Sequence, residues 1–187
     1  MKKRVVLLSL PLLICLGFTS ALVQGEMGGA KWGFGFDAGY AMPMGDFGDG
    51  FDGAITVGAN ACYMFTEQYA LELAVGWNKH TCTDDEDWTF QLMPVSLNFM
   101  AGFPTGGKLI PYVKGGVGMY SEKIEYKLSG VSISDTESDF GFNAGGGVKF
   151  PVAETTLLDV GVRLHHILTE DEATQYVTAT IGVGFMF

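Results

Sequence analysis

The sequence has few charged residues, which argues against an ordinary water-exposed surface over most of the chain. Only 17% of its 187 residues are Asp, Glu, Lys or Arg, whereas about a quarter of residues are charged in a typical soluble domain. Glycine and aromatic residues are abundant instead, with 27 Gly, 14 Phe, 7 Tyr and 3 Trp. We therefore expect something other than water to face much of the folded surface, and the length allows one domain.

The apolar run at the N-terminus, 5–18, is too short for a membrane-spanning helix, which needs about 20 residues. It has the features of a cleaved signal peptide instead. These features are a basic start and small residues after the apolar run, here Lys2, Lys3, Arg4, Ser20, Ala21 and Gly25. We predict a signal peptide for export through the Sec pathway over 1–25 and a mature domain over 26–187.

Basic residues are scarce, and they become scarcer once the predicted signal peptide is removed. Loss of three basic residues changes the formal net charge from −10 to −13, because all 21 acidic residues lie beyond residue 25. Such a charge disfavours binding to the phosphate backbone of DNA or RNA. We therefore predict no nucleic-acid partner.

Cysteine is also rare, with three in the whole chain. Cys62 falls in a predicted strand, and Cys82 falls in a predicted loop at the far end of the neighbouring strand. At roughly 3.3 Å per residue their separation would be about 30 Å, which exceeds the reach of a disulfide. We predict two free thiols and no disulfide framework.

Alternation of apolar and small or polar residues dominates the mature sequence. A period of two predicts strands with one apolar face. Eight segments have this pattern: 31–42, 55–63, 69–77, 88–101, 113–119, 140–150, 158–164 and 177–187. In the fourth segment the apolar phase changes around Pro94, which predicts a β-bulge.

The connections between these segments alternate in length. Short links are expected at 65–68, 102–109 and 151–154, and longer ones at 43–52, 79–87, 121–139 and 169–173. Short turns at one end and long loops at the other are typical of membrane β-barrels. We predict an all-β fold, an eight-stranded antiparallel up-and-down transmembrane β-barrel, with no helix required.

The polar face of the strands decides between this barrel and a soluble eight-stranded barrel of the lipocalin type. That face consists of small residues with isolated charges, three acidic and three basic: Asp37, Glu72, Lys114, Lys149, Asp159 and Arg163. As a water-exposed exterior it would be unusually poor in charge. Inside a narrow lumen the six charges would neutralise one another, and eight strands leave an interior that side chains fill. We predict lipid outside and a self-neutralised charge network inside.

Five segments of the sequence are similar to strands of the outer-membrane β-barrel domain family, which includes OmpA- and OmpX-like barrels and proteins of the porin family. They read GDFGDGFDGAITVGANACYMF, PYVKGGVGMY, FGFNAGGGVKF, LDVGVRLHH and VTATIGVGFMF, and the similarity as a whole covers nearly all of the mature chain. The resemblance implies an outer-membrane location in a Gram-negative-type bacterium, next to lipid and lipopolysaccharide. It also implies that Phe185 and Phe187 form the C-terminal signal that the barrel-assembly machinery reads.

The remaining candidate sites are weak. Fifteen of the 21 acidic residues fall in the predicted long loops, which indicates either a cation-collecting face or ordinary solvated loops, and the second is the more common. His80, Cys82 and Asp84 form a candidate metal cluster without a preorganised surrounding. We predict no cofactor and no metal site, and the sequence does not determine the oligomeric state.

An enzymatic role would depend on the histidine pair His165 and His166. Outer-membrane lipid A deacylases are barrels of this size that use a Ser two residues after the His as nucleophile, but Ile167 and Leu168 occupy these positions here. We therefore predict a noncatalytic barrel with a structural or surface-interaction role. A narrow small-solute channel and a lipid A-modifying enzyme remain as alternatives. Aromatic girdles at the membrane interfaces are expected to include Trp32, Tyr40, Tyr63, Tyr69, Trp77, Trp88, Phe103 and Phe150.

Overall fold

The structure is a computed structural model and describes residues 32–85, 87–106, 109–128, 131–169 and 173–187. The predicted signal peptide lies outside the described residues. The strands are β1 (Trp32–Met44), β2 (Ala54–Met64), β3 (Tyr69–Thr81), β4 (Trp88–Gly102), β5 (Ile110–Leu128), β6 (Val131–Ala153), β7 (Thr156–Ile167) and β8 (Thr174–Met186). One short helix, α1 (Asp46–Gly50), lies between β1 and β2. No helix in the described part of the chain is long and apolar enough to cross a membrane.

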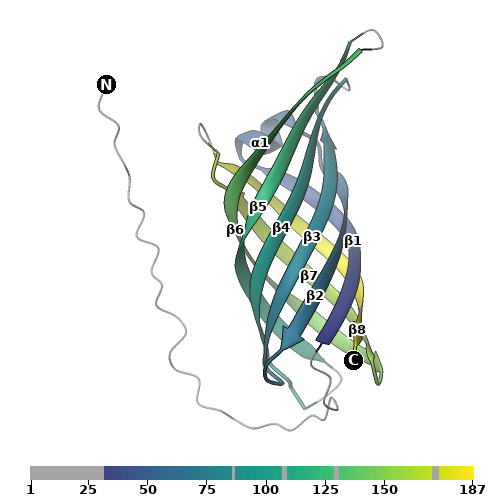
Figure 1. Ribbon diagram of the computed structural model, residues 1–187. Coiled ribbons are helices and arrows are strands. Elements are labelled where there is room, and N and C mark those ends of the chain that lie inside the picture. The colour runs from purple at the N-terminus through teal and green to yellow at the C-terminus, as the bar shows by residue number, and fades with distance from the viewer. Residues whose placement is uncertain (1–31, 86, 107–108, 129–130, 170–172) are drawn as a thin grey trace, which may run out of the picture.

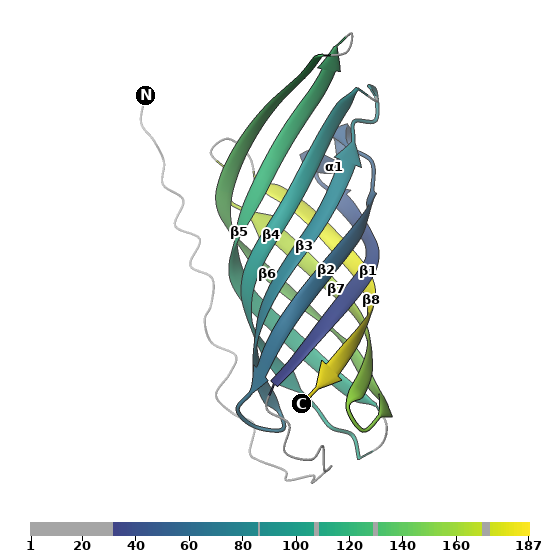
Figure 2. The ribbon, with the colours of Figure 1, turned by 45° about the vertical axis from the view of Figure 1, so that its right-hand side comes forward.

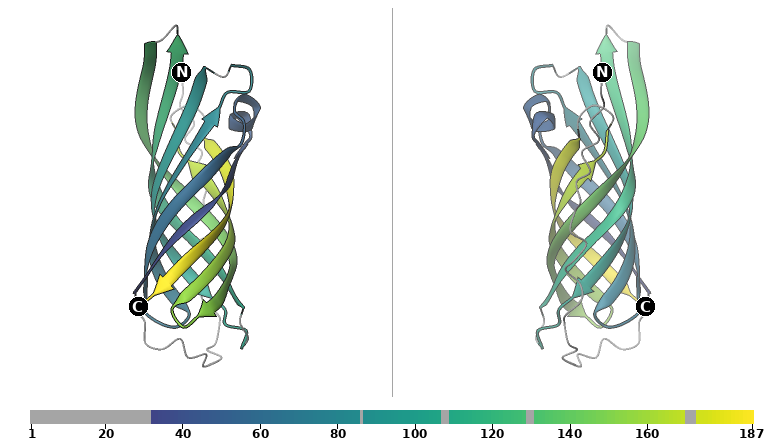
Figure 3. Two further views of the ribbon diagram at one scale, coloured as in Figure 1. Left: turned by 90° about the vertical axis from the view of Figure 1, so that its right-hand side faces the viewer. Right: turned by 90° about the vertical axis from the view of Figure 1, so that its left-hand side faces the viewer.

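The eight strands form one closed barrel in which each strand pairs antiparallel with the next along the chain. Pairing of β1 with β8, from Gly33 opposite Met186 to Met44 opposite Gln175, closes the sheet (Figures 1 and 3). This confirms the predicted up-and-down barrel. We call the end with the turns after β2, β4 and β6 the short-turn end, and the opposite end the long-loop end.

The outer surface of the barrel is apolar because alternate side chains on every strand point away from the lumen. Large apolar side chains that a soluble core would bury are half exposed, such as Phe36 at 55%, Leu73 at 55% and Ile181 at 61%. The intervening residues face inward and are mostly small or polar. This arrangement is that of a barrel whose outer face contacts lipid.

The apolar surface ends below the long-loop end. In β3 the outward position that follows Trp77 is Lys79, and in β5 the outward position that follows Met119 is Ser121. The same change to polar residues occurs on neighbouring strands, at Gln91, Ser138, His166 and Gln175. The strands therefore continue beyond the part that would span the bilayer.

Two predictions about this end are wrong. The segment 121–139 is a hairpin rather than a loop: β5 and β6 pair without a register shift from Tyr120 opposite Asp139 to Leu128 opposite Val131. Figure 2 shows this hairpin rising above the other strands. The first long loop contains helix α1, which follows Gly45 at φ 61°. The outward positions of the hairpin are polar, at Ser121, Lys123 and Glu125 on β5 and Ser134, Thr136 and Ser138 on β6, so the outward apolar period that marks the other strands stops there.

The bulge predicted at Pro94 is also wrong. The β4–β5 register is continuous from Trp88 opposite Tyr126 to Gly102 opposite Tyr112. Phe90 and Leu92 break the apolar phase because they point into the lumen and are buried there. The two cysteines in the described residues are both free, as predicted.

Candidate functional site

The centre of the lumen is organised around the carboxylate of Glu72 on β3. Lys114 Nζ donates to its Oε1 and Oε2 at 2.9 Å and 3.2 Å. Arg163 Nη2 donates to Oε1 at 3.3 Å. The Glu72 side chain is only 3% exposed, so these cations stabilise a charge that water barely reaches.

Two asparagines extend this group across the lumen. Asn98 Nδ2 donates to Glu72 Oε1 and to Ser96 Oγ, both at 3.1 Å. Asn143 Nδ2 donates to Asn98 Oδ1 at 2.8 Å. These amides carry no charge, so a search for inward charged residues does not identify them. Their position in the alternation does indicate that they face inward, since Asn98 lies between the outward residues Leu97 and Phe99.

A second group lies nearer the short-turn end. Lys149 Nζ is 3.5 Å from Asp159 Oδ2, and the Tyr112 hydroxyl donates to Asp159 Oδ1 at 2.8 Å. Glycines make room for the Tyr112 ring: a β-carbon at Gly161 would lie 2.6 Å from its hydroxyl oxygen, and one at Gly147 2.7 Å. Glycine on the inner face is therefore a packing requirement in this narrow barrel.

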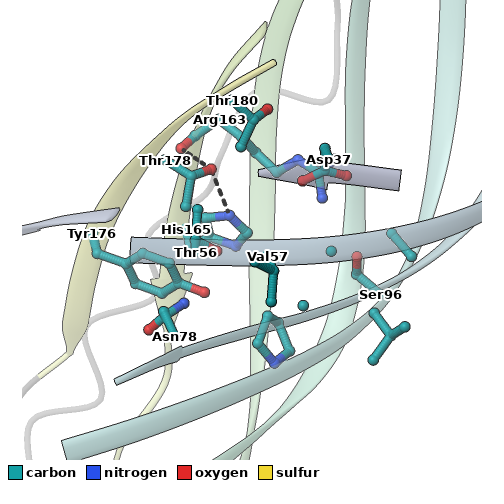
Figure 4. A pocket seen from close by; sticks show the side chains of 15 residues that line it. Asp37, Thr56, Val57, Asn78, Ser96, Arg163, His165, Tyr176, Thr178 and Thr180 are labelled. Atoms are coloured by element: carbon teal, nitrogen blue, oxygen red, sulfur yellow. Dashed lines mark hydrogen bonds between the residues drawn. The ribbon is translucent and has the colours of Figure 1, made fainter. Parts of the chain in front are cut away.

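Asp37 lies between the two groups. Together with Arg163 it lines two small cavities, each of about 50 Å³. Figure 4 shows the Asp37 carboxylate and the Arg163 side chain at one of these cavities. Each cavity has room for a few water molecules and for no larger solute. All six charged residues singled out in the sequence thus face one polar band of the lumen, and five of them form ion pairs.

An apolar cluster fills the lumen toward the long-loop end. We call it the outer cluster, and its buried members are Ala41, Phe90, Leu92, Tyr120, Ile167 and Tyr176. Phe47 of α1 and Phe51 pack against it from above, so the helix lies over the mouth of the barrel (Figure 2). The cluster was not predicted from the sequence, because its inward aromatic residues fall out of phase with the outward apolar pattern and resemble interruptions of it.

The histidine pair is split between the two faces of β7. His165 is 3% exposed inside the barrel, where its ring stacks on Tyr176 at 4.3 Å and 1°. Its Nδ1 lies 3.0 Å from the Tyr120 hydroxyl. Its Nε2 lies 3.5 Å from Thr178 Oγ1 (Figure 4). His166, the next residue along the strand, occupies an outward position.

His80 belongs to the lumen rather than to a loop. Its Nδ1 donates to the Asp52 carbonyl oxygen at 2.8 Å, and its Nε2 lies 2.8 Å from Asn78 Oδ1. Both ring nitrogens are therefore engaged, and burial lowers the pKa of His80. Within the described ranges no three His, Cys, Asp or Glu side chains are arranged to hold a metal ion.

The hairpin of β5 and β6 carries a buried acid. Glu122 is 9% exposed, and its Oε1 has no hydrogen-bond partner among the described residues. Burial, reinforced by the charges of Asp139 and Glu137, raises the pKa of Glu122 to about 7. Its neighbours Ser121 and Lys123 lie beyond the apolar surface, so this acid is outside the part of β5 that would span the bilayer.

Aromatic rings gather around the outer surface near both ends. At the short-turn end Trp32 and Tyr63 pack with ring centroids 4.7 Å apart. Near the long-loop end, Tyr40 and Trp77 are 48% and 38% exposed on the outer surface. Trp88, predicted for the same girdle, instead packs on Tyr126 at 4.9 Å in the inward phase of β4. Phe187 lies at the short-turn rim with its ring 6.0 Å from that of Phe34, and its backbone pairs with Trp32.

Residues 10–187 match the family model described as the outer membrane protein beta-barrel domain. No curated protein matches the sequence significantly. Among solved structures, Neisserial surface protein A is similar with a TM-score of 0.65 and 19% identity, over 83% of this chain and 97% of that one.

Two further barrels are similar in the same way. Ail, the attachment invasion locus protein of Yersinia pestis, has a TM-score of 0.58 and 14% identity, over 84% of this chain and 99% of that one. OprG from Pseudomonas aeruginosa has a TM-score of 0.57 and 16% identity, over 87% and 99%. At these identities the likeness shows a shared fold.

Proposed function

Because the chain belongs to the outer membrane protein β-barrel domain family, we propose that it is a noncatalytic, closed barrel that acts at the cell surface through its β5–β6 hairpin. The observation that carries this proposal is the hairpin itself, which continues regular strand pairing beyond the apolar surface. In barrels of this family the long loops face outward from the cell and the short turns face the periplasm. The hairpin then lies outside the cell.

One strand of the hairpin has a free edge. Pairing of β6 with β7 begins at Gly141, opposite Ile167, so residues 131–139 of β6 pair with β5 alone. Side chains 133–138 are all exposed. An edge of this kind can accept an extended segment of another protein as an added strand.

The charge of the hairpin selects the partner. Residues 121–139 contain five acidic residues, Glu122, Glu125, Asp135, Glu137 and Asp139, against two basic ones, Lys123 and Lys127. One solved structure of Ail contains the heparin analogue sucrose octasulfate. The acidic hairpin of the present chain would repel such a sulfated ligand and favours a cationic segment instead.

The interior supports the noncatalytic and nonconducting parts of the proposal. The outer cluster and the polar band leave cavities of about 50 Å³, which is far less than a small-solute pathway needs. His165 is buried between Tyr120 and Tyr176 rather than aligned with a nucleophile at the lipid-facing surface. A lipid acyl chain outside the barrel would not reach its imidazole.

The test measures binding of a decalysine peptide to the folded barrel in nanodiscs of neutral phosphatidylcholine, which expose both ends. The variant Asp135→Asn/Glu137→Gln/Asp139→Asn should weaken binding at least tenfold. The matched control, Glu67→Gln/Glu154→Gln, removes carboxylates from the short-turn end and should leave the Kd unchanged. Equal affinity of the hairpin variant and the wild-type barrel would reject the hairpin as the binding surface.

A further inference from the structure

The methionines of the described residues divide into two groups. Four of them, Met42, Met44, Met93 and Met119, are at least 42% exposed on the outer surface. The other three, Met64, Met100 and Met186, face the lumen, and all three line one cavity near the short-turn end. Cys62 lines the same cavity. We call these four residues the sulfur cluster.

The sulfur atoms of Cys62 and Met186 lie close together. A β-carbon built on Gly33 would be 2.6 Å from Met186 Sδ and 3.0 Å from Cys62 Sγ. The two sulfurs are therefore no more than the sum of these distances, 5.6 Å, apart. Gly33 leaves open the space between them that any larger residue would fill.

The other two members line the same cavity from β2 and β4. Met64 packs against Met100 and Tyr112, and Met100 is only 7% exposed. The cavity has a volume of about 50 Å³. That is enough for one ion, which would take the place of water there. Polar groups at the cavity are Lys149, the Tyr112 hydroxyl and, at the turn, Glu67 and Gln68.

Three thioethers and one thiol form a donor set for a soft cation. Oxygen-seeking ions such as Mg²⁺ and Ca²⁺ would gain little from it, whereas Cu⁺ prefers thioether and thiolate sulfur. Binding would replace the Cys62 thiol proton by the metal, and the proton would leave to solvent. The thiolate and Cu⁺ then cancel in charge, so the lumen gains no net charge.

We propose that the sulfur cluster is a binding site for a single Cu⁺ ion at the short-turn end of the barrel. Methionine also serves as an adaptable filler of apolar interiors. Substitution by leucine distinguishes the two roles. Leucine preserves the volume and packing of methionine but supplies no metal ligand.

The experiment uses the full chain with Cys15→Ser and Cys82→Ser, folded in detergent under anaerobic conditions. Cu⁺ is titrated in competition with the chelator bathocuproine disulfonate. The barrel should retain one equivalent of Cu⁺, and Met100→Leu/Met186→Leu should lower its affinity at least tenfold. The control Met93→Leu/Met119→Leu, which changes two outward methionines, should bind as before. No retention against the chelator, or equal retention by the inward variant, would overturn the proposal.

A second readout does not depend on the competitor. Ag⁺, which matches Cu⁺ in ligand preference and does not change oxidation state, should protect Cys62 from alkylation by N-ethylmaleimide. Protection should be lost in Met100→Leu/Met186→Leu, provided that heat-modifiable gel migration shows this variant to be folded. Protection that persists in that folded variant would show that Cys62 binds silver alone, and would reject the cluster.

Discussion

Lys114 Nζ and Glu72 Oε1 lie 2.9 Å apart in the middle of the lumen, with the two side chains 9% and 3% exposed. Glu72 also accepts from Arg163 and Asn98. Removal of one partner of a buried ion pair strongly lowers the free energy of unfolding, because the remaining charge is left without water or a counterion.

Glu72→Gln and Lys114→Met should each therefore destabilise the folded barrel by about 3 kcal/mol or more. The double variant should cost less than the sum of the two, since no uncompensated charge of that pair remains. Urea unfolding of the barrel in lipid vesicles measures these changes. The control is Lys123→Met, which removes a half-exposed ion pair with Glu125 and should cost under about 1 kcal/mol.

Substitutions at Leu73 and Ile133 distinguish the effect of lipid contact on stability from the effect of exposure alone. Their exposed fractions are similar, 55% and 64%, but Leu73 lies on the apolar surface and Ile133 on the hairpin. Leu73→Arg should destabilise the barrel by about 2–4 kcal/mol in lipid, as expected for an arginine near the middle of a bilayer. Ile133→Arg should change stability by under about 0.5 kcal/mol. Equal costs at the two positions would contradict a lipid-facing surface.

The stability of the folded barrel depends on pH through Glu122 of the hairpin. Its pKa in the folded barrel, about 7, lies above the reference value of 4.5, so folding favours the protonated form. The resulting stability is fully present below about pH 4.5 and is lost as the pH rises through 7. Titration of ¹³C-labelled glutamate side chains by NMR should show a midpoint near 7 for Glu122. Asp139→Asn should lower that midpoint, and a wild-type midpoint near 4.5 would refute the effect of burial.

Phe187 has an exposed ring at the short-turn rim, 66% accessible, so its removal should cost little folding energy. Phe187→Ser should nevertheless reduce the amount of protein in isolated outer membranes several-fold, if the last aromatic residue is read during assembly. Refolding in detergent should be unaffected. Phe65→Ser is the control, because Phe65 lies in a turn at the same end with 48% exposure. Loss of refolding by Phe187→Ser would indicate a structural role instead.

The number and order of strands could be predicted from the sequence because lipid imposes a strict period of two. In β3, Tyr69 to Trp77 alternate without exception, and the strand begins at Tyr69 as predicted. At the long-loop end the predicted strands end too early. Lys79 and Thr81 of β3 carry no apolar period, yet backbone pairing continues through them.

The interior was harder to predict than the exterior. The six inward charges could be found because charge is rare in this sequence, and the structure brings them to one band of the lumen. The outer cluster could not be found, since Phe90 and Tyr120 are indistinguishable in type from the outward aromatics Phe99 and Phe140. Only the closed register, which fixes the face of every residue, distinguishes the two sets.

The most direct test of a closed lumen is the conductance of single barrels in a planar lipid bilayer at molar KCl. Insertion of folded protein is checked by heat-modifiable gel migration, and a porin of known conductance is the positive control. Since the outer cluster and the ion pairs around Glu72 fill the interior, the wild-type barrel should give no stable conductance steps. Steady ohmic steps from the wild-type barrel would contradict a packed interior and favour a small-solute channel.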